Sequence, residues 1–325
     1  MNAPPFGARF SLLDKPFCSG NITTDKGACG MAIWNLGSIN IDHVYQLDHL
    51  PRPGETLAAR SYSQGLGGKG ANQSIAAARA GAMTHHIGAM GTADGWVIDR
   101  LAARGVCTAD IARLPDAVTG HAIILLDRQA ENAIVIHPGA NRAMTPAMLE
   151  KPLSAIKPQD TLLIQNETGC QIEAARIARQ AGALVIYSAA PFDIAAVRAV
   201  LPYASILAMN AGEADELFAA IPDDLPVQGL LITRGAEGAE YRDLTSGTIH
   251  RQEAFAVDPV DTTGAGDTFA GYFAAALDRG DDVPAALRLA AGAAALKVTR
   301  PGAGDAIPGL EEVMAFIANW GSEPS

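Results

Sequence analysis

The sequence is poor in cysteine, in basic residues and in long apolar runs, and each shortage excludes a class of protein. The 325 residues include four cysteines without metal-ligand spacing, Cys18, Cys29, Cys107 and Cys170, and so few thiols are typical of a reducing compartment. Acidic residues outnumber basic ones by 35 to 24, a net charge of −11, which disfavours nucleic acid as a partner because phosphates require a basic surface. No apolar run reaches the roughly 18–20 residues of a membrane span. We therefore expect a soluble cytoplasmic enzyme.

Two parts of the chain differ in patterning. Residues 1–30 mix Pro, Gly, Ser and Thr with short apolar pairs, show no period and lack a secretory signal pattern. We expect them to form a mobile N-terminal extension, with packing on the surface as the alternative. Ordered patterning begins at Met31, and we expect one domain over residues 31–318 followed by a tail over 319–325.

Short apolar runs alternate with helical stretches through most of this domain. The predicted strands are 32–37, 84–89, 162–165, 184–187, 206–209 and 230–233, and the predicted helices include 96–104, 172–180 and 284–297. The alternation predicts an α/β fold with a mostly parallel central sheet covered by helices on both faces. A hairpin signal at 121–126 and 132–137 interrupts it. Together with 56–63, these runs are the predicted strands of a small β-sheet lid, around residues 42–64 and 119–137.

A glycine-rich turn over residues 261–267 is the strongest chemical signal. It follows an apolar, strand-like run at 255–257 and opens a helix whose apolar positions recur at 269, 272, 273, 276 and 277. Gly264 and Gly266 allow the backbone to approach a ligand, and the first N–H groups of the helix favour an anion there. The carboxylate of Asp267 can accept a proton from an attacking hydroxyl group; the alternative is that Asp267 only caps the helix.

Two further segments offer groups for a polyol. Asn40 and Asp42 are two residues apart, so on an extended chain they point the same way and suit a pair of sugar hydroxyls; an ordinary turn is the alternative. Residues 65–73 form a second glycine-rich loop with Lys69 and Asn72. Because Gly70 follows Lys69, the Walker spacing is absent and a P-loop kinase is disfavoured.

Three motifs occur in one order along the chain, namely Gly-Ser-Ile-Asn-Ile-Asp at 37–42, Gly-Gly-Lys-Gly-Ala-Asn-Gln at 67–73, and Asp-Thr-Thr-Gly-Ala-Gly-Asp-Thr-Phe at 261–269. Together they resemble the ribokinase family of carbohydrate kinases over residues 31–318. The resemblance implies an α/β sandwich with a small lid and ATP-dependent phosphorylation of a sugar's primary hydroxyl, with D-ribose as the expected substrate. The alternatives are a nucleoside or another sugar as substrate, and a non-catalytic sugar- or nucleotide-binding regulator on the same fold.

The resemblance also implies roles for individual residues of this chain. Asp267 is the implied general base, and the N–H groups of Gly264, Ala265 and Gly266 are the implied anion hole. The implied sugar contacts are Asn40, Asp42, Gly67, Gly68, Lys69, Asn72, Glu167 and Asp267. The implied ATP contacts are Asn210, Thr233, Arg234, Gly235, Ala236, Glu237, Gly238, Gly266 and Ala291. For Glu167, a surface carboxylate near a helix start is the alternative.

Two metal ions are implied as well. Asn210 and Glu213 are expected to hold Mg²⁺ through water, which suits an ion that keeps several waters; the same pair also fits a helix capping box, and both roles can hold together. A potassium ion that raises activity is expected near the glycine-rich turn, bound mostly by backbone carbonyls of Asp261, Thr263, Lys297, Arg300 and Gly302. Two positions depart from the family pattern, Ser188 in place of the usual Asn and Ala306 in place of a frequent hydroxyl residue.

The apolar hairpin predicts an oligomer. One face of a small lid can cover the sugar, while the other carries Ile, Val and Leu that would meet water, and a patch of this kind usually marks an interface. We expect a homodimer through the lid around a twofold axis. The alternative is a monomer in which residues 1–30 cover the lid.

Overall fold

The computed structural model describes residues 31–129, 131–222 and 225–321. The predicted N-terminal extension, residues 1–30, and residues 322–325 of the predicted tail lie outside this range. The last described helix, α9, runs from Leu310 to Asn319 and so reaches one residue beyond the predicted end of the domain.

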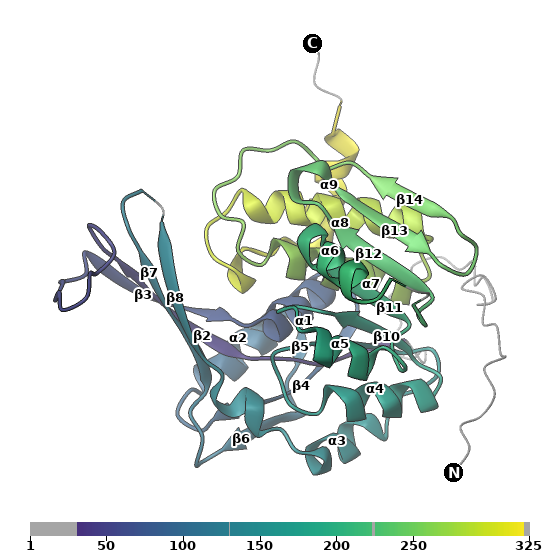
Figure 1. Ribbon diagram of the computed structural model, residues 1–325, viewed down its shortest axis with the longest axis horizontal. Coiled ribbons are helices and arrows are strands. Elements are labelled where there is room, and N and C mark those ends of the chain that lie inside the picture. The colour runs from purple at the N-terminus through teal and green to yellow at the C-terminus, as the bar shows by residue number, and fades with distance from the viewer. Residues whose placement is uncertain (1–30, 130, 223–224, 322–325) are drawn as a thin grey trace. The chain divides into compact units, whose positions relative to one another are not determined.

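A ten-stranded sheet forms the centre of the described domain (Figure 1). Its order is β14-β13-β12-β11-β10-β9-β1-β4-β5, with β6 also paired to β4. Neighbours from β12 to β5 run parallel, and only β13 and β14 at one edge are antiparallel. The strands are β1 Ala32–Leu36, β4 Met83–Gly91, β5 Val106–Cys107, β6 Ile111–Leu114, β9 Thr161–Gln165, β10 Leu184–Ser188, β11 Ile206–Asn210, β12 Gly229–Thr233, β13 Ala239–Asp243 and β14 Ile249–Gln252. The predicted mostly parallel sheet is confirmed.

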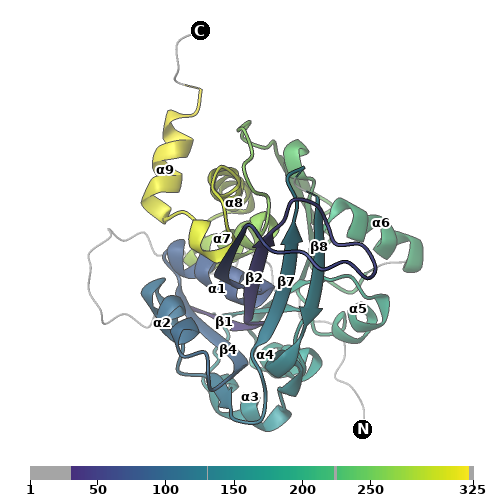
Figure 2. The ribbon, with the colours of Figure 1, turned by 90° about the vertical axis from the view of Figure 1, so that its left-hand side faces the viewer.

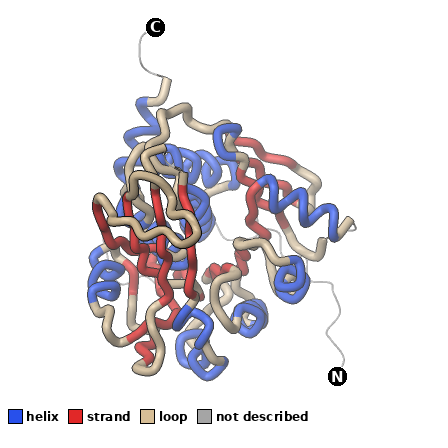
Figure 3. Tube along the Cα trace, turned by 60° about the vertical axis from the view of Figure 1, so that its left-hand side comes forward, coloured by secondary structure: helices blue, strands red, loops and turns tan. Residues whose placement is uncertain are grey.

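Helices cover both faces of this sheet, and Figure 3 shows them in blue around the red strands. Consecutive strand residues point to opposite faces, and accordingly Ile33 packs in one apolar cluster and its neighbour Trp34 in the other. The Ile33 cluster includes α1 Lys69–Arg79, α2 Trp96–Ala103, α7 Ala265–Arg279 and α8 Val283–Val298; the Trp34 cluster includes α3 Pro146–Leu153, α4 Gln171–Gln180, α5 Ile194–Val200 and α6 Ala211–Ala220. Short 3₁₀ turns lie at Gly139–Ala143, Gly235–Glu237 and Gly304–Ala306.

A separate four-stranded sheet, here called the lid sheet, has the order β3-β2-β7-β8 (Figure 2). Its strands are β2 Asn40–Gln46, β3 Ser61–Gly67, β7 Gly120–Leu126 and β8 Asn132–His137. The predicted hairpin is confirmed, since β7 and β8 pair antiparallel from His121 opposite His137 to Leu126 opposite Asn132.

The other predicted lid strand, 56–63, is misplaced. The strand begins at Ser61 and continues through Gly65 and Gly67, which the sequence assigned to a loop because glycine is rare in strands. The alternative predicted for Asn40 and Asp42, an ordinary turn, is wrong, because β2 begins at Asn40 and pairs along its whole length with β3 and β7. The expectation that the two residues share one side of an extended chain is confirmed.

The apolar run at 255–257 is not a strand. The last strand before α7 is β14, and residues 253–264 form no ladder. Phe255 is buried because its ring packs 5.4 Å from Phe316 and 5.1 Å from Trp320, at the end of α9. In the described residues, no helix is long and apolar enough to cross a lipid bilayer.

Candidate active site

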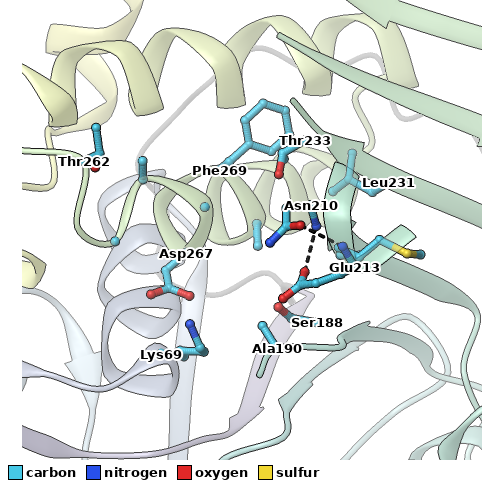
Figure 4. Close-up of a pocket in the computed structure, with 16 residues that line it drawn as sticks. Lys69, Ser188, Ala190, Asn210, Glu213, Leu231, Thr233, Thr262, Asp267 and Phe269 are labelled. Carbon is cyan, nitrogen blue, oxygen red and sulfur yellow. Dashed lines mark hydrogen bonds between the residues drawn. The ribbon is translucent and has the colours of Figure 1, made fainter. Parts of the chain in front are cut away.

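A pocket lies where the carboxyl ends of β10, β11 and β12 face the start of α7 (Figure 4). This is the edge at which an open parallel sheet binds ligands. The lining includes Lys69, Ser188, Asn210, Glu213, Thr233, Thr262 and Phe269, and the whole glycine-rich stretch from Gly264 to Asp267. Ser188, a departure from the family pattern, thus faces this pocket.

Asp267 lies in the first turn of α7, and its carboxylate is held by two amides of α1. The Nδ2 group of Asn72 donates to Oδ2 at 3.0 Å, and the Nε2 group of Gln73 donates to Oδ1 at 3.1 Å. Asp267 is buried yet lines the pocket. The N-cap of α7 is Gly264, and the Asp267 carboxylate accepts its hydrogen bonds from α1, so the predicted alternative, a capping role alone, does not describe it.

Lys69 begins α1, and its side chain points toward the neighbouring Asp267 carboxylate (Figure 4). Burial lowers the pKa of the ammonium group, but the charges of Asp267, Glu167 and Glu213 outweigh it, so the pKa lies above its usual value. Lys69 is therefore a cation at neutral pH. It offsets the charge of three carboxylates that converge on one region.

Two carboxylates, Asp42 of the lid strand β2 and Glu167, lie close enough for their charges to interact. Glu167 follows β9, and its Oε2 atom accepts hydrogen bonds from the Ser38 hydroxyl and from the backbone N–H of Lys69 at 3.2 Å. Burial, together with the nearby charge of Glu167, raises the pKa of Asp42 to about 6. Paired acceptors of this kind suit the hydroxyl groups of a polyol. Glu167 is half-buried and hydrogen-bonded, so it is not the surface carboxylate of the predicted alternative.

Asn40 is fixed by a residue that the sequence reading missed. Asn141 donates to Oδ1 of Asn40 at 2.8 Å and accepts from the N–H of Ile39 at 2.9 Å. Both asparagines are buried. Asn141 lies in the 3₁₀ turn after β8, about 100 residues from Asn40 in the chain, and no local pattern connects the two.

A buried network of polar side chains connects the first half of α1 with strands β1, β4 and β9. Gln165 donates to the side-chain oxygens of Asn35 at 2.9 Å and of Gln73 at 2.8 Å, and Asn35 in turn donates to Ser74 at 2.8 Å. Ser74 contacts His86 at 2.8 Å. Burial lowers the pKa of His86 to about 4, so this histidine is neutral at pH 7. The network fixes Gln73, one of the two amides that hold Asp267.

The turn before α7 has the form that an anion site requires. Gly264 adopts φ +73°, a left-handed conformation that favours glycine. A Cβ atom at Gly266 would meet nothing within 4 Å, so its backbone is open to a ligand. The first N–H groups of a 15-residue helix face this turn. The predicted anion hole therefore lies beside the predicted base.

The expected nucleotide residues divide into two groups. Asn210, Thr233 and Gly266 line the pocket, whereas Arg234–Gly238 and Ala291 are not in its lining. Arg234 instead donates to Glu240 of β13 at 3.0 Å. Ala291 is buried within α8.

Asn210 and Glu213 form the capping box that the sequence predicted as one reading. Oδ1 of Asn210 accepts from the N–H of Glu213 at 2.9 Å, and Oε2 of Glu213 accepts from the N–H of Asn210 at 2.8 Å (Figure 4). A carboxylate has about four acceptor positions, so the cap leaves capacity for a water-bound metal. No cluster of three or more His, Cys, Asp or Glu side chains with metal-site geometry occurs in residues 31–129, 131–222 and 225–321.

The residues expected around potassium are brought together, with one unexpected contact. Gly302 donates its N–H to Oδ2 of Asp261 at 2.8 Å, and Thr263 donates its N–H to Oδ1 at 2.9 Å. The ammonium group of Lys297 donates to the backbone carbonyl of Asp261 at 2.7 Å. The guanidinium group of Arg300 pairs with Glu312 of α9.

Comparison with known proteins identifies the family of this chain. Residues 33–309 match the family described as "pfkB family carbohydrate kinase". The chain belongs to this family. It is 34% identical over 300 residues to the ribokinase of Haemophilus influenzae, covering 87% of this chain and 97% of that protein. It is 36% identical over 294 residues to the ribokinase of Bacillus subtilis, covering 87% and 98%.

The fold comparison agrees. A solved structure of Arabidopsis thaliana ribokinase complexed with ribose and ATP superposes with a TM-score of 0.81 at 28% identity, covering 89% of this chain and 99% of that one. The predicted family and fold class are confirmed, and this pfkB chain is an ATP-dependent carbohydrate kinase.

Three supporting residues of this kinase were missed by the sequence reading. Ser38 and Gln73 lie inside motifs that the sequence singled out, adjacent to residues assigned to the site. Ser38 holds Glu167 and accepts from the N–H of Gly70 at 3.2 Å, and Gln73 holds Asp267. Their motif membership was the available signal, but polar type alone does not separate a supporting residue from a binding one. For Asn141 the sequence offers no such signal.

Proposed function

We propose that this kinase transfers the γ-phosphoryl group of ATP to the primary 5-hydroxyl of D-ribose. The observation that carries the proposal is the Asp267 carboxylate, which two amides hold in the wall of the pocket at the start of α7. Its charge acts on Lys69 together with that of Glu167. Ribose is the favoured sugar because the relatives from H. influenzae and B. subtilis are ribokinases and the Arabidopsis ribokinase structure contains ribose and ATP.

In this mechanism the sugar lies against the lid side, with its hydroxyls bound by Asp42, Asn40 and Glu167. Asp267 accepts the proton of the 5-hydroxyl as that oxygen attacks the γ-phosphorus in line. The N–H groups of Gly264, Ala265 and Gly266 stabilise the charge on the transferring group. ADP is released and ribose 5-phosphate is formed. The protein contributes positioning and electrostatics rather than covalent chemistry.

Magnesium is part of the proposal. Mg²⁺ prefers hard oxygen ligands and usually keeps several waters, and Asn210 and Glu213 supply such oxygens at the pocket wall. The two residues would hold the ion through water, and the ion would neutralise phosphate charge. A cytoplasmic location, suggested by the few cysteines, belongs to the same proposal. In place of the expected potassium ion, we propose a basic side chain of the protein itself as the source of positive charge beside Asp261.

The test is a steady-state screen of the purified protein with Mg-ATP across pentoses, hexoses and nucleosides. The highest kcat/KM is expected for D-ribose. A higher value for a nucleoside would select the nucleoside alternative, and binding of sugar and ATP without any turnover would select the regulator. In the Asp267→Asn variant, turnover is expected to fall roughly 10²-fold or more while binding changes only a few-fold, as for loss of a general base. The matched control is Asp99→Asn, at an exposed position on α2.

A homodimer through the lid sheet is also proposed. All six residues of β8 are exposed, including Ile134 at 51%, Val135 at 64% and Ile136 at 59%. Neighbouring strand residues point to opposite faces, so apolar side chains of β8 meet water on both faces of the sheet. β8 is also an edge strand with unpaired backbone groups. Pairing of two lid sheets around a twofold axis would cover one of these faces and the edge.

A further inference from the structure

Lys297, in the last turn of α8, is a basic residue whose side chain is completely buried. Among the described residues it is the only lysine or arginine in the buried class, with 0% of its surface exposed. Its Nζ atom donates to the backbone carbonyl of Asp261 at 2.7 Å and lies 4.0 Å from Oδ1 of the same residue. A buried ammonium group is stable only where acceptors and negative charge compensate it, and Asp261 supplies both.

The turn that Lys297 contacts is fastened to the end of α8 by other bonds as well. The carbonyl of Val298 accepts the N–H groups of Val260 at 2.7 Å and of Asp261 at 3.0 Å. The N–H of Gly302, in the loop after α8, donates to the Asp261 carboxylate. The carbonyl end of a helix carries partial negative charge and favours a cation. Lys297 therefore supplies positive charge where the fold provides a cation site.

The residues present do not fit the potassium site that the sequence led us to expect. One expected oxygen ligand, the carbonyl of Asp261, already accepts the Lys297 ammonium group. A second cation at that oxygen would be repelled by the first at short range. The Asp261 carboxylate, the nearest negative charge, already accepts the N–H groups of Thr263 and Gly302. The last turn of α8 thus places a covalently attached cation at this carbonyl.

We propose that the Lys297 ammonium group takes the place of a potassium ion, holding the Asp261 carbonyl so that the turn leading to Gly264–Gly266 keeps its shape without any bound monovalent cation. Lys297 is a positioning residue, because it acts on the anion hole through the backbone of Asp261, three residues before Gly264. The inference rests on the proposed kinase function insofar as the shape of the turn is detected through phosphoryl transfer.

The first experiment uses the unmodified full-length protein. Its kcat with ribose and Mg-ATP and its Tm are measured in potassium, sodium and tetramethylammonium chloride at equal ionic strength. We expect kcat to agree within about twofold and Tm to be the same in all three salts. A severalfold rise of kcat in potassium, or a rise of Tm specific to potassium, would overturn the proposal. This experiment needs no variant and is unaffected by folding defects.

The second experiment removes the ammonium group in two ways. Lys297→Ala leaves space for an ion, and we expect a loss of kcat of up to roughly 10²-fold, with much of it restored by potassium or ammonium but not by tetramethylammonium. Lys297→Met fills the space without charge and should lose kcat without rescue. Lys151→Ala, on the exposed surface of α3, is the matched control and should behave as the unmodified protein.

The two proposals fail in different ways. If no sugar is phosphorylated in any salt, the kinase proposal fails, and the Tm series still tests Lys297: potassium should raise the Tm of Lys297→Ala and leave the Tm of the unmodified protein and of Lys297→Met unchanged. If ribose is phosphorylated and Lys297→Ala keeps its full kcat in tetramethylammonium, the role of Lys297 is refuted while the kinase function holds.

Discussion

The carboxyl group of Asp42 has a pKa raised to about 6, first because of burial and second because of the charge of Glu167. As an acceptor for sugar hydroxyls it must be ionised. We therefore expect the KM for ribose to rise as pH falls through about 6, by about tenfold for each further pH unit. Measurement of KM between pH 5 and about 8 tests this, and the Asp42→Asn variant should show a high KM without that dependence. A flat profile in the unmodified protein would contradict the assignment.

The same shift has an effect on stability with a definite sign. The folded protein binds the Asp42 proton more tightly than the unfolded chain does, because the pKa of this carboxyl group is near 3.8 in the unfolded chain. The contribution of the protonated Asp42 to the free energy of unfolding is complete below pH 3.8. It is lost as pH rises through about 6, where the buried carboxyl group ionises. Asp42→Asn is therefore expected to raise the free energy of unfolding, relative to the unmodified protein, by roughly 1–3 kcal/mol at about pH 8 and by little at about pH 4. Denaturant unfolding at both pH values measures it, and equal differences would contradict the prediction.

Position 67 must be glycine because a larger residue would clash with the Asp42 side chain, and not because of its backbone conformation. A Cβ atom at position 67 would lie 2.2 Å from Oδ2 of Asp42, whereas a Cβ at Gly65, in the same strand, would meet nothing within 4 Å. We expect Gly67→Ala to displace the Asp42 carboxylate and to raise the KM for ribose about tenfold or more, with a smaller effect on the KM for ATP. Gly65→Ala is the matched control and should leave both constants near their starting values. Equal effects of the two substitutions would refute this explanation.

At the scale of elements, the contact between α1 and α7 sets the position of the base. Gly271 allows this contact, since a Cβ there would lie 2.5 Å from Cβ of Ala76 and 2.6 Å from the carbonyl of Gln73. We expect Gly271→Ala to push the helices apart, lengthen the bonds from Asn72 and Gln73 to Asp267, and lower kcat roughly 10²-fold. The Tm should fall as well, because an overpacked core typically loses about 1–3 kcal/mol. Unchanged kcat and Tm would show that the helix spacing is not critical.

Elements with a single clear period were predictable from the sequence, and those with mixed signals were not. The buried parallel strands and the amphipathic start of α7 follow from local apolar patterns. β3 was misplaced because Gly65 and Gly67 do not resemble strand residues, although close approach of Asp42 requires the second of them. Residues 255–257 resembled a strand because burial against α9 leaves the same apolar signature as burial in a sheet.

At the scale of the whole molecule, the site is assembled from segments far apart in the chain. Asp267 is held by residues 194 and 195 positions earlier, and Glu167 is held by Ser38, 129 positions away. The motifs predicted the reactive residues, because each of these lies in a short segment with its own chemistry. It could not identify Asn141 as the support of Asn40, or Lys297 as the cation beside Asp261, because these contacts exist only once the sheet has been ordered.

The proposed dimer is tested by the exposed apolar strand β8. We expect light scattering to give twice the chain mass for the unmodified protein and the single chain mass for Val135→Glu, because a buried charge would oppose pairing of the lid sheets. Met314→Glu, at a position on α9 that is 57% exposed, is the matched control and should stay dimeric. A full-length monomer that dimerises only when it is shortened to begin at Met31 would select the alternative, in which residues 1–30 cover the lid.

The reciprocal cap of α6 has a consequence for observing the reaction. The amide proton of Asn210 is held by the carboxylate of Glu213, the side chain proposed to face the magnesium–nucleotide complex. A bound ion or nucleotide that attracts this carboxylate would weaken its hydrogen bond with the Asn210 amide. The rate at which the amide proton exchanges with deuterium would then change. The first turn of α6 would thus act as a natural isotopic reporter, and its exchange rate would indicate how much of the protein carries nucleotide at each moment, without an added label.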